Sequence, residues 1–214
     1  MIGKASLAAL ALALGTSDAT PSLVPDFNAS KFTYRSAFEG SLWDGQHVSQ
    51  GGTFDLVRLD ARTVRVEEEG GESAVARYDG ALLSLDRSTS EALGSAVGYV
   101  NQFAAPVLAH GSFQPGDSWT ARLPVYLGGG APLEGDAKVT VVSVDGDRVM
   151  LQATASLSGT STYGAYTTPI DLSLRLAERF ARGTLVRGDA AVSEVVHAAG
   201  QEQTLRWTMS LAQQ

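Results

Sequence analysis

The sequence contains no cysteine, which excludes disulfide bonds, thiolate chemistry and a lipid anchor attached to a cysteine. It is also poor in positive charge, because 16 Lys and Arg residues stand against 23 Asp and Glu residues, for a net charge of −7. That balance argues against a nucleic-acid partner and against docking to anionic lipid surfaces. No apolar run is long enough to span a bilayer as a helix.

The first nineteen positions have the pattern of a secretory signal peptide. Lys4 is followed by an apolar run over residues 7–14 and then by small residues, with predicted cleavage after Ala19. The alternative is an N-terminal helix that stays on the protein. We expect a secreted or periplasmic chain that does not span a membrane after cleavage, and an exported chain without cysteine favours a bacterial envelope.

Beyond the signal peptide the chain divides into a short leader and one domain. Residues 20–30 carry two prolines and small polar residues, which predicts an extended leader. Residues 31–214 then show repeated strand and hairpin signals, which predicts a single β-rich domain.

Strand signals dominate that domain. Ile170, Leu172, Leu174 and Leu176 alternate strictly with polar residues, as in a strand with one wet face. Asp145-Gly146-Asp147 and Asp79-Gly80 are hairpin signals between apolar runs. Residues 122–127 are interrupted by Pro124, which suits an edge strand. We count about ten strands and expect them to form an antiparallel sheet.

One segment has helical rather than strand periodicity. Apolar residues recur at spacings of three and four between Leu93 and Val107, after the capping sequence Ser88-Thr89-Ser90-Glu91. This predicts a helix over residues 89–105, and Gly94 and Gly98 suggest a close approach to a sheet. The resulting fold class is mainly β: a single curved, half-barrel-like antiparallel sheet with one helix packed on its concave side.

The stretch FQPGDSWT follows the helix. Pro115-Gly116 fits the middle of a type II turn, Asp117 can bond nearby backbone N–H groups, and Trp119 begins the next strand. This predicts that the turn returns the chain from helix to sheet and sends the Trp119 ring inward, with a binding role for Trp119 as the alternative.

Pro115, Gly116, Asp117 and Trp119 resemble a turn found in uncharacterised secreted bacterial β-rich proteins. The order of strands, helix and long hairpins over residues 54–211 also resembles periplasmic lipoprotein carriers of the LolA and LppX type. That resemblance implies a curved antiparallel sheet capped by helices over a hydrophobic cavity.

Catalytic and metal patterns are missing from the sequence. His47, His110 and His197 have no neighbour at metal-ligand spacing, so we predict no metal site. Most aspartates stand beside glycine, as turn residues do, and no G-x-S-x-G elbow occurs. We predict no cofactor, no catalytic residue and no enzyme activity; a hydrolase built from residues distant in sequence is the alternative.

The favoured hypothesis is an exported, non-catalytic protein that binds or carries a hydrophobic ligand, such as a lipid or an acyl chain, in the bacterial envelope. The alternative is a structural or interaction module with a filled core, no ligand and an envelope protein as partner. The residues expected to line a cavity are Leu93, Val97, Val100, Phe103, Trp119, Leu172, Leu174 and Trp207.

Overall fold

The structure, a computed structural model, describes residues 31–41, 44–60, 62–78, 83–85, 90–104, 113–125, 133–163, 166–182, 184–198 and 200–214. The predicted signal peptide and leader, the predicted Asp79-Gly80 turn and His110 lie outside these residues.

The described residues form eleven strands and one helix, α1 (Glu91–Ala104). The strands are β1 (Lys31–Ser41), β2 (His47–Arg58), β3 (Thr63–Glu68), β4 (Ser73–Tyr78), β5 (Leu83–Leu85), β6 (Ser118–Val125), β7 (Leu133–Asp145), β8 (Arg148–Tyr163), β9 (Tyr166–Ala181), β10 (Thr184–Ala198) and β11 (Gln201–Gln213).

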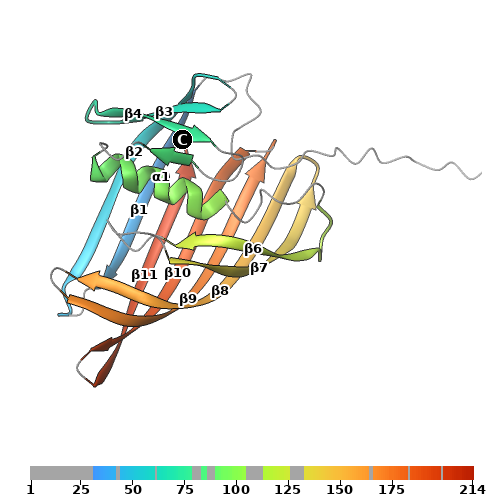
Figure 1. Ribbon diagram of the computed structural model, residues 1–214. Helices are drawn as coiled ribbons and strands as arrows, with labels where there is room; N and C mark the ends of the chain where they lie inside the picture. The colour runs from blue at the N-terminus through green and yellow to red at the C-terminus, as the bar shows by residue number, and fades with distance from the viewer. Residues whose placement is uncertain are drawn as a thin grey trace, which may run out of the picture.

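All eleven strands belong to one open sheet with the order β5-β4-β3-β2-β1-β11-β10-β9-β8-β7-β6 (Figure 1). The first and last strands pair antiparallel in the middle of the sheet. The chain therefore winds outward from the centre to the edge strand β5, passes through α1, and returns inward from the opposite edge strand β6. The predicted fold class is confirmed, with one strand more than the count of about ten.

Local sequence signals explain the long hairpins. In β9 the alternating leucines are buried and the polar residues between them are exposed, as the period of two requires. The predicted turn at Asp145–Arg148 joins β7 to β8, with Gly146 at a φ of 60°. The predicted edge position of the strand that contains Pro124 is also confirmed, because β6 is the last strand of the sheet.

The Pro-Gly-Asp turn has the predicted form. Gly116 has a φ of 92°, and the N–H of Asp117 donates to the carbonyl of Gln114 over 3.0 Å. The Asp117 carboxylate accepts from the N–H of Gln114 over 2.8 Å. These bonds fix the entry into β6, where the half-buried Trp119 ring lies 5.8 Å from that of Phe113.

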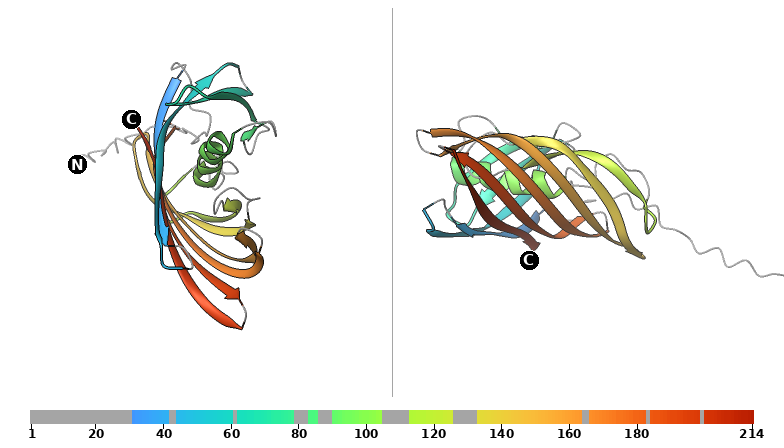
Figure 2. Two further views of the ribbon diagram at one scale, coloured as in Figure 1. Left: turned by 90° about the vertical axis from the view of Figure 1, so that its left-hand side faces the viewer. Right: turned by 90° about the horizontal axis from the view of Figure 1, so that it is seen from below.

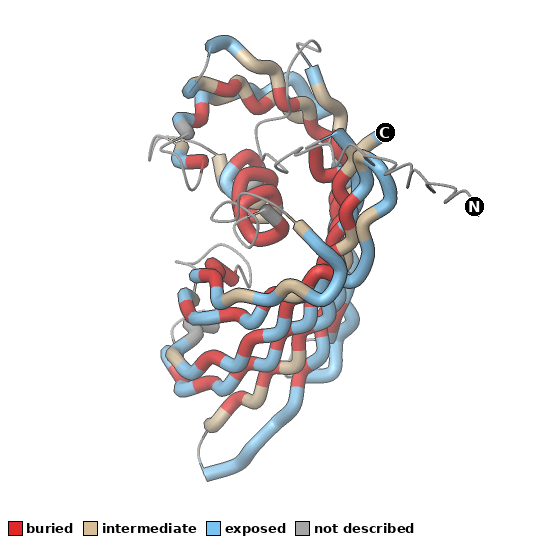
Figure 3. The backbone as a smooth tube through the Cα atoms, turned by 90° about the vertical axis from the view of Figure 1, so that its right-hand side faces the viewer, coloured by how far each residue is buried: buried red, intermediate tan, exposed pale blue. Residues whose placement is uncertain are grey.

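The sheet curls around α1 (Figure 2), and buried and exposed residues alternate along its long strands (Figure 3). The helix packs against β3, β4 and β5 on one side and β6, β10 and β11 on the other. Ser90 caps its start, because the Ser90 hydroxyl accepts from the N–H of Leu93. The expected close approach at Gly94 is wrong: Gly94 is exposed, and a Cβ built there meets nothing within 4 Å.

A side chain attaches α1 to the edge strand β5. The Asn101 amide donates to the carbonyl of Leu83 and accepts from its N–H, both over 2.8 Å. Asn101 is buried and so satisfies two groups of an edge strand that a further strand would otherwise pair. The helix is thereby held at β5 by one amide as well as by apolar packing.

A glycine in β10 allows the last turn of α1 to pack closely on the sheet. A Cβ added at Gly188 would overlap the ring of Phe103, which is itself fully buried. The absence of a side chain at Gly188 therefore leaves a slot that the Phe103 ring occupies.

We expect Gly188→Ala to lower the free energy of unfolding by about 1–3 kcal/mol, because the new methyl group must displace Phe103 in a close-packed core. Gly52→Ala is the matched control, since Gly52 also lies on a strand and its added Cβ meets nothing within 4 Å. Urea unfolding of both variants measures the difference, and equal stabilities would contradict the slot.

Candidate functional site

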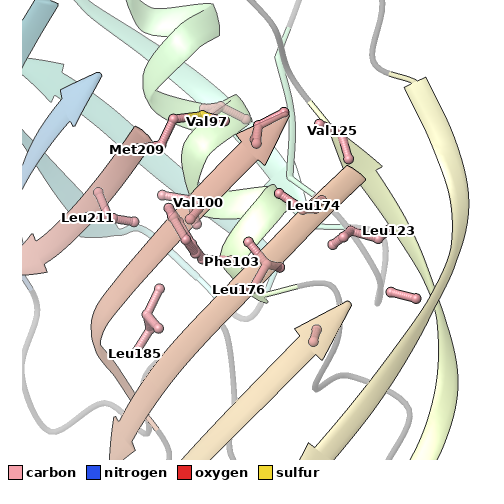
Figure 4. Close-up of a cluster of buried hydrophobic side chains, with 14 of the residues drawn as sticks. Val97, Val100, Phe103, Leu123, Val125, Leu174, Leu176, Leu185, Met209 and Leu211 are labelled. Carbon is pink, nitrogen blue, oxygen red and sulfur yellow. The ribbon is translucent and has the colours of Figure 1, made fainter. Parts of the chain in front are cut away.

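The first candidate site is the apolar interface between α1 and the concave face of the sheet (the α1–sheet interface). Val97, Val100 and Phe103 point from the helix into a cluster formed with strand residues (Figure 4). The strand residues labelled there are Leu123, Val125, Leu174, Leu176, Leu185, Met209 and Leu211. Side chains from the helix and from β6, β9, β10 and β11 therefore meet in one core.

Seven of the eight predicted cavity-lining residues are buried in this core, namely Leu93, Val97, Val100, Phe103, Leu172, Leu174 and Trp207. Trp119 is the exception, because it is only half-buried and packs on Phe113 near the start of β6. Their role as the lining of a ligand cavity stays a prediction, and a ligand at this interface would have to replace side chains that now pack on one another.

Two carboxyl groups lie on the same concave face, and sequence reasoning missed both. Glu178 in β9 and Glu194 in β10 are fully buried. Each stands at an inward position of its strand: Glu178 lies between Leu176 and Phe180, and Glu194 between Val192 and Val196. The period of two in the sequence could have revealed both carboxyl groups, since a charged residue in phase with the buried apolar residues of its strand must point inward.

Glu194 has hydrogen-bond partners, whereas Glu178 has none in the part of the chain that the structure describes. The indole N–H of Trp207 donates to Oε2 of Glu194 over 2.9 Å. Trp207 is held by a stacked contact with Phe38, at 5.1 Å between ring centroids, and by the bare backbone of Gly40. Glu194 and Trp207 thus form a satisfied polar pair within the core.

Both carboxyl oxygens of Glu178 lack a hydrogen-bond partner among the described residues. In the sheet Glu178 faces Leu151 of β8 and Gly188 of β10, and the Phe103 ring lies over Gly188. Burial alone raises the pKa of Glu178 well above 4.5, so the group is held as the neutral acid. Burying a polar group without a partner costs about 1–3 kcal/mol.

A polar cluster on the opposite face of the sheet involves the one described histidine with an acidic partner. The Asp171 carboxylate accepts from the Ser158 hydroxyl and lies 3.0 Å from Nε2 of His197. Nδ1 of His197 lies 3.3 Å from Glu202. The hydrogen bonds from Ser158 and His197 lower the pKa of Asp171. In a catalytic triad the imidazole contacts the serine hydroxyl and activates it as a nucleophile. Here the carboxylate contacts the serine instead, so the three residues are not arranged as a triad.

A groove of about 760 Å³ lies on this convex face, across β1, β11, β10, β9 and β8. Its lining includes Arg175, Arg187, Asp189, Glu39 and Thr208, which alternate with the core residues of their strands. Arg187 and Asp189 form an ion pair in it at 2.7 Å. The groove lies on the face of the sheet opposite α1, so it is separate from the α1–sheet interface.

The described residues contain no group of three or more His, Asp and Glu side chains placed to hold a metal ion. They also contain no helix that is both long and apolar enough to cross a bilayer.

Comparisons with known proteins give one structural similarity. No protein-family model matches the chain, and no curated protein matches it by sequence. Among solved structures it is similar to the LolA superfamily protein NE2245 from Nitrosomonas europaea, with 10% identity over 92% of this chain and 90% of that chain and a TM-score of 0.25. That protein bears the LolA name that the sequence resemblance suggested. Because so low a TM-score does not establish a shared fold, we take neither ligand nor mechanism from it.

The raised pKa of Glu178 gives a prediction for the pH dependence of stability. Between pH 4.5 and its folded pKa, the folded state keeps a proton that the unfolded state loses, so stability falls as pH rises. Relative to Glu178→Gln, the free energy of unfolding should therefore decline by up to about 1.4 kcal/mol per pH unit above pH 5.

Chemical denaturation of the wild-type protein and the Glu178→Gln variant between pH 5 and 8 measures this slope. Glu194→Gln is the control for a buried carboxyl with a partner. Parallel pH profiles for the wild-type protein and Glu178→Gln would show that Glu178 is not a buried neutral acid.

Proposed function

We propose that the protein is an exported, non-catalytic protein that binds or carries a hydrophobic ligand, such as a lipid or an acyl chain, in the bacterial envelope. The observation that carries this proposal is the α1–sheet interface. An apolar helical stripe lies on an apolar concave face of an open sheet, so removing the helix would uncover a continuous apolar surface.

Replacing α1 by an apolar ligand on the concave face would change the free energy of apolar burial little. Each buried Val, Leu or Phe side chain of α1 contributes about 1.5–3 kcal/mol through its contact with the sheet. An apolar ligand that covers the same surface restores the same kind of burial. Because the backbone hydrogen bonds of α1 are internal to the helix, the helix can leave the sheet without breaking a strand ladder.

Export is proposed from the N-terminal sequence alone, where Lys4 and the apolar run over residues 7–14 precede the predicted cleavage site after Ala19. The absence of catalysis is proposed from the order of contacts around Asp171, in which the histidine does not contact the serine.

A structural or interaction module of the envelope is the second candidate. The close packing of the predicted cavity residues favours it, because those side chains already fill one another's space. The groove on the convex face would then be the place for an envelope protein partner. The two candidates differ in whether α1 must move, which is the quantity to test.

A reversible lock on α1 can separate the two candidates. A Cβ built at Gly188 lies 2.5 Å from Cγ of Phe103, so the two Cβ atoms are at most about 4 Å apart and within reach of a disulfide. The chain has no cysteine, so a Phe103→Cys/Gly188→Cys variant contains one possible pair. We expect reduction to increase binding of a fluorescent neutral lipid by about tenfold or more, equal to about 1.4 kcal/mol.

The matched control is Arg77→Cys/Ser84→Cys, which links neighbouring positions of β4 and β5 at the sheet surface and leaves α1 untouched. Its binding should not depend on the redox state. Equal binding by the oxidised and reduced forms of the Phe103/Gly188 variant, or no binding of lipid probes by the wild-type protein, would contradict the carrier and favour the module.

A further inference from the structure

We propose that Glu178 is the polar recognition group of the ligand site, and that it selects apolar ligands whose polar end donates a hydrogen bond and carries no negative charge. Alcohols, amides and amines have that chemistry; fatty acids and phosphates do not. This inference rests on the proposed function and deepens it by naming the ligand class.

The contrast between the two buried carboxyl groups is the first support. Glu194 accepts a hydrogen bond from Trp207, so its place in the core is explained by the protein itself. Glu178 is buried to the same extent, yet neither of its oxygens has a partner among the described residues. A leucine would fill the same position without that cost, so the carboxyl is explained by a partner that arrives from outside.

The slot beside Glu178 provides the place for that partner. Gly188 lies directly opposite Glu178 in the antiparallel pair, so the carboxyl and the slot share one face of the sheet. The slot is now filled by the Phe103 ring. When α1 moves away, the ring leaves the slot, and the space that it vacates adjoins the carboxyl group.

An apolar track leads away from this position along β9 and β10. The pairs Leu176–Ala190 and Leu174–Val192 follow Glu178 on the concave face, and all four side chains are buried. Six residues separate Glu178 from the row of Leu172, which corresponds to about 20 Å of strand. One lipid chain, at about 15 Å or half the hydrocarbon core of a bilayer, fits this length.

The chemistry of the site determines which polar ends of a ligand Glu178 favours and which it disfavours. The neutral Glu178 carboxyl accepts a hydrogen bond from a hydroxyl or an amide through its carbonyl oxygen, and it can transfer its proton to an amine and pair with the resulting ammonium group. A carboxylate or phosphate would bring a full negative charge into a dry site whose neighbours in this row of the sheet, Leu151 and Gly188, carry no charge, and burial of an unpaired anion is unfavourable. Arg179 and Arg187 flank this row but are exposed on the convex face.

The test compares three amphiphiles with one saturated chain and different ends: a primary alcohol, a primary amine and a carboxylate. Displacement of a fluorescent neutral lipid from the mature protein gives their affinities. We expect the alcohol and the amine to bind the wild-type protein about tenfold more tightly than the carboxylate, a difference that one hydrogen bond can supply.

Variants at Glu178 then assign the selection to that residue. Glu178→Leu should remove the preference by weakening the alcohol and the amine, while Glu178→Gln, which still accepts a hydrogen bond, should keep the alcohol and weaken the amine. Glu194→Gln is the matched control, because it changes a buried carboxyl that already has a partner. It should leave the order of affinities unchanged.

The outcomes separate this inference from the proposed function. If no amphiphile binds the wild-type protein, the proposed function fails and the inference fails with it. If all three bind equally and Glu178→Leu changes none of them, the carrier stands and the role of Glu178 is refuted. A preference for the carboxylate would also refute it.

Discussion

The packing of α1 against the concave face is the interaction on which the rest of the structure depends. A sheet that curves without closing has two edges, and its inner face carries apolar side chains from nearly every strand. Neither edge can cover that face. The helix stripe of Val97, Val100 and Phe103 does so, and the connection through α1 is also what takes the chain from β5 at one edge to β6 at the other.

A helix that covers the concave face is easier to displace than a strand would be. A strand that covered an edge would form backbone hydrogen bonds with it, and its removal would expose backbone groups along its whole length. A helix satisfies its own backbone, so side-chain contacts hold it, including the Asn101 bonds to Leu83 and the bond from the Gln102 amide to Sδ of Met209. The helix that covers the concave face can thus be displaced without breaking the hydrogen-bond ladder of the sheet.

Local pattern in the sequence predicted much of the fold and part of the site. The alternation over residues 170–176, the Asp145–Asp147 hairpin and the helix are short-range features that depend on neighbouring residues. The pairing of β1 with β11 and the position of the edges depend on contacts between distant residues, and no local pattern encodes them. Glu178 was missed because the alternation was followed only over residues 170–176, although its phase in β9 places it inward.

The location of the buried polar groups bears on which of them an incoming molecule could meet. Asn101 and Gln102 are buried at the α1–sheet interface, but they belong to the helix and would move with it. Glu178 and Glu194 belong to strands in the middle of the sheet and would stay in place. Since Glu194 is already bonded to Trp207, displacement of α1 leaves Glu178 beside the emptied slot. Glu178 is fixed in the sheet, so it can distinguish ligands only after α1 has moved. Opening of the site and selection among ligands are therefore coupled.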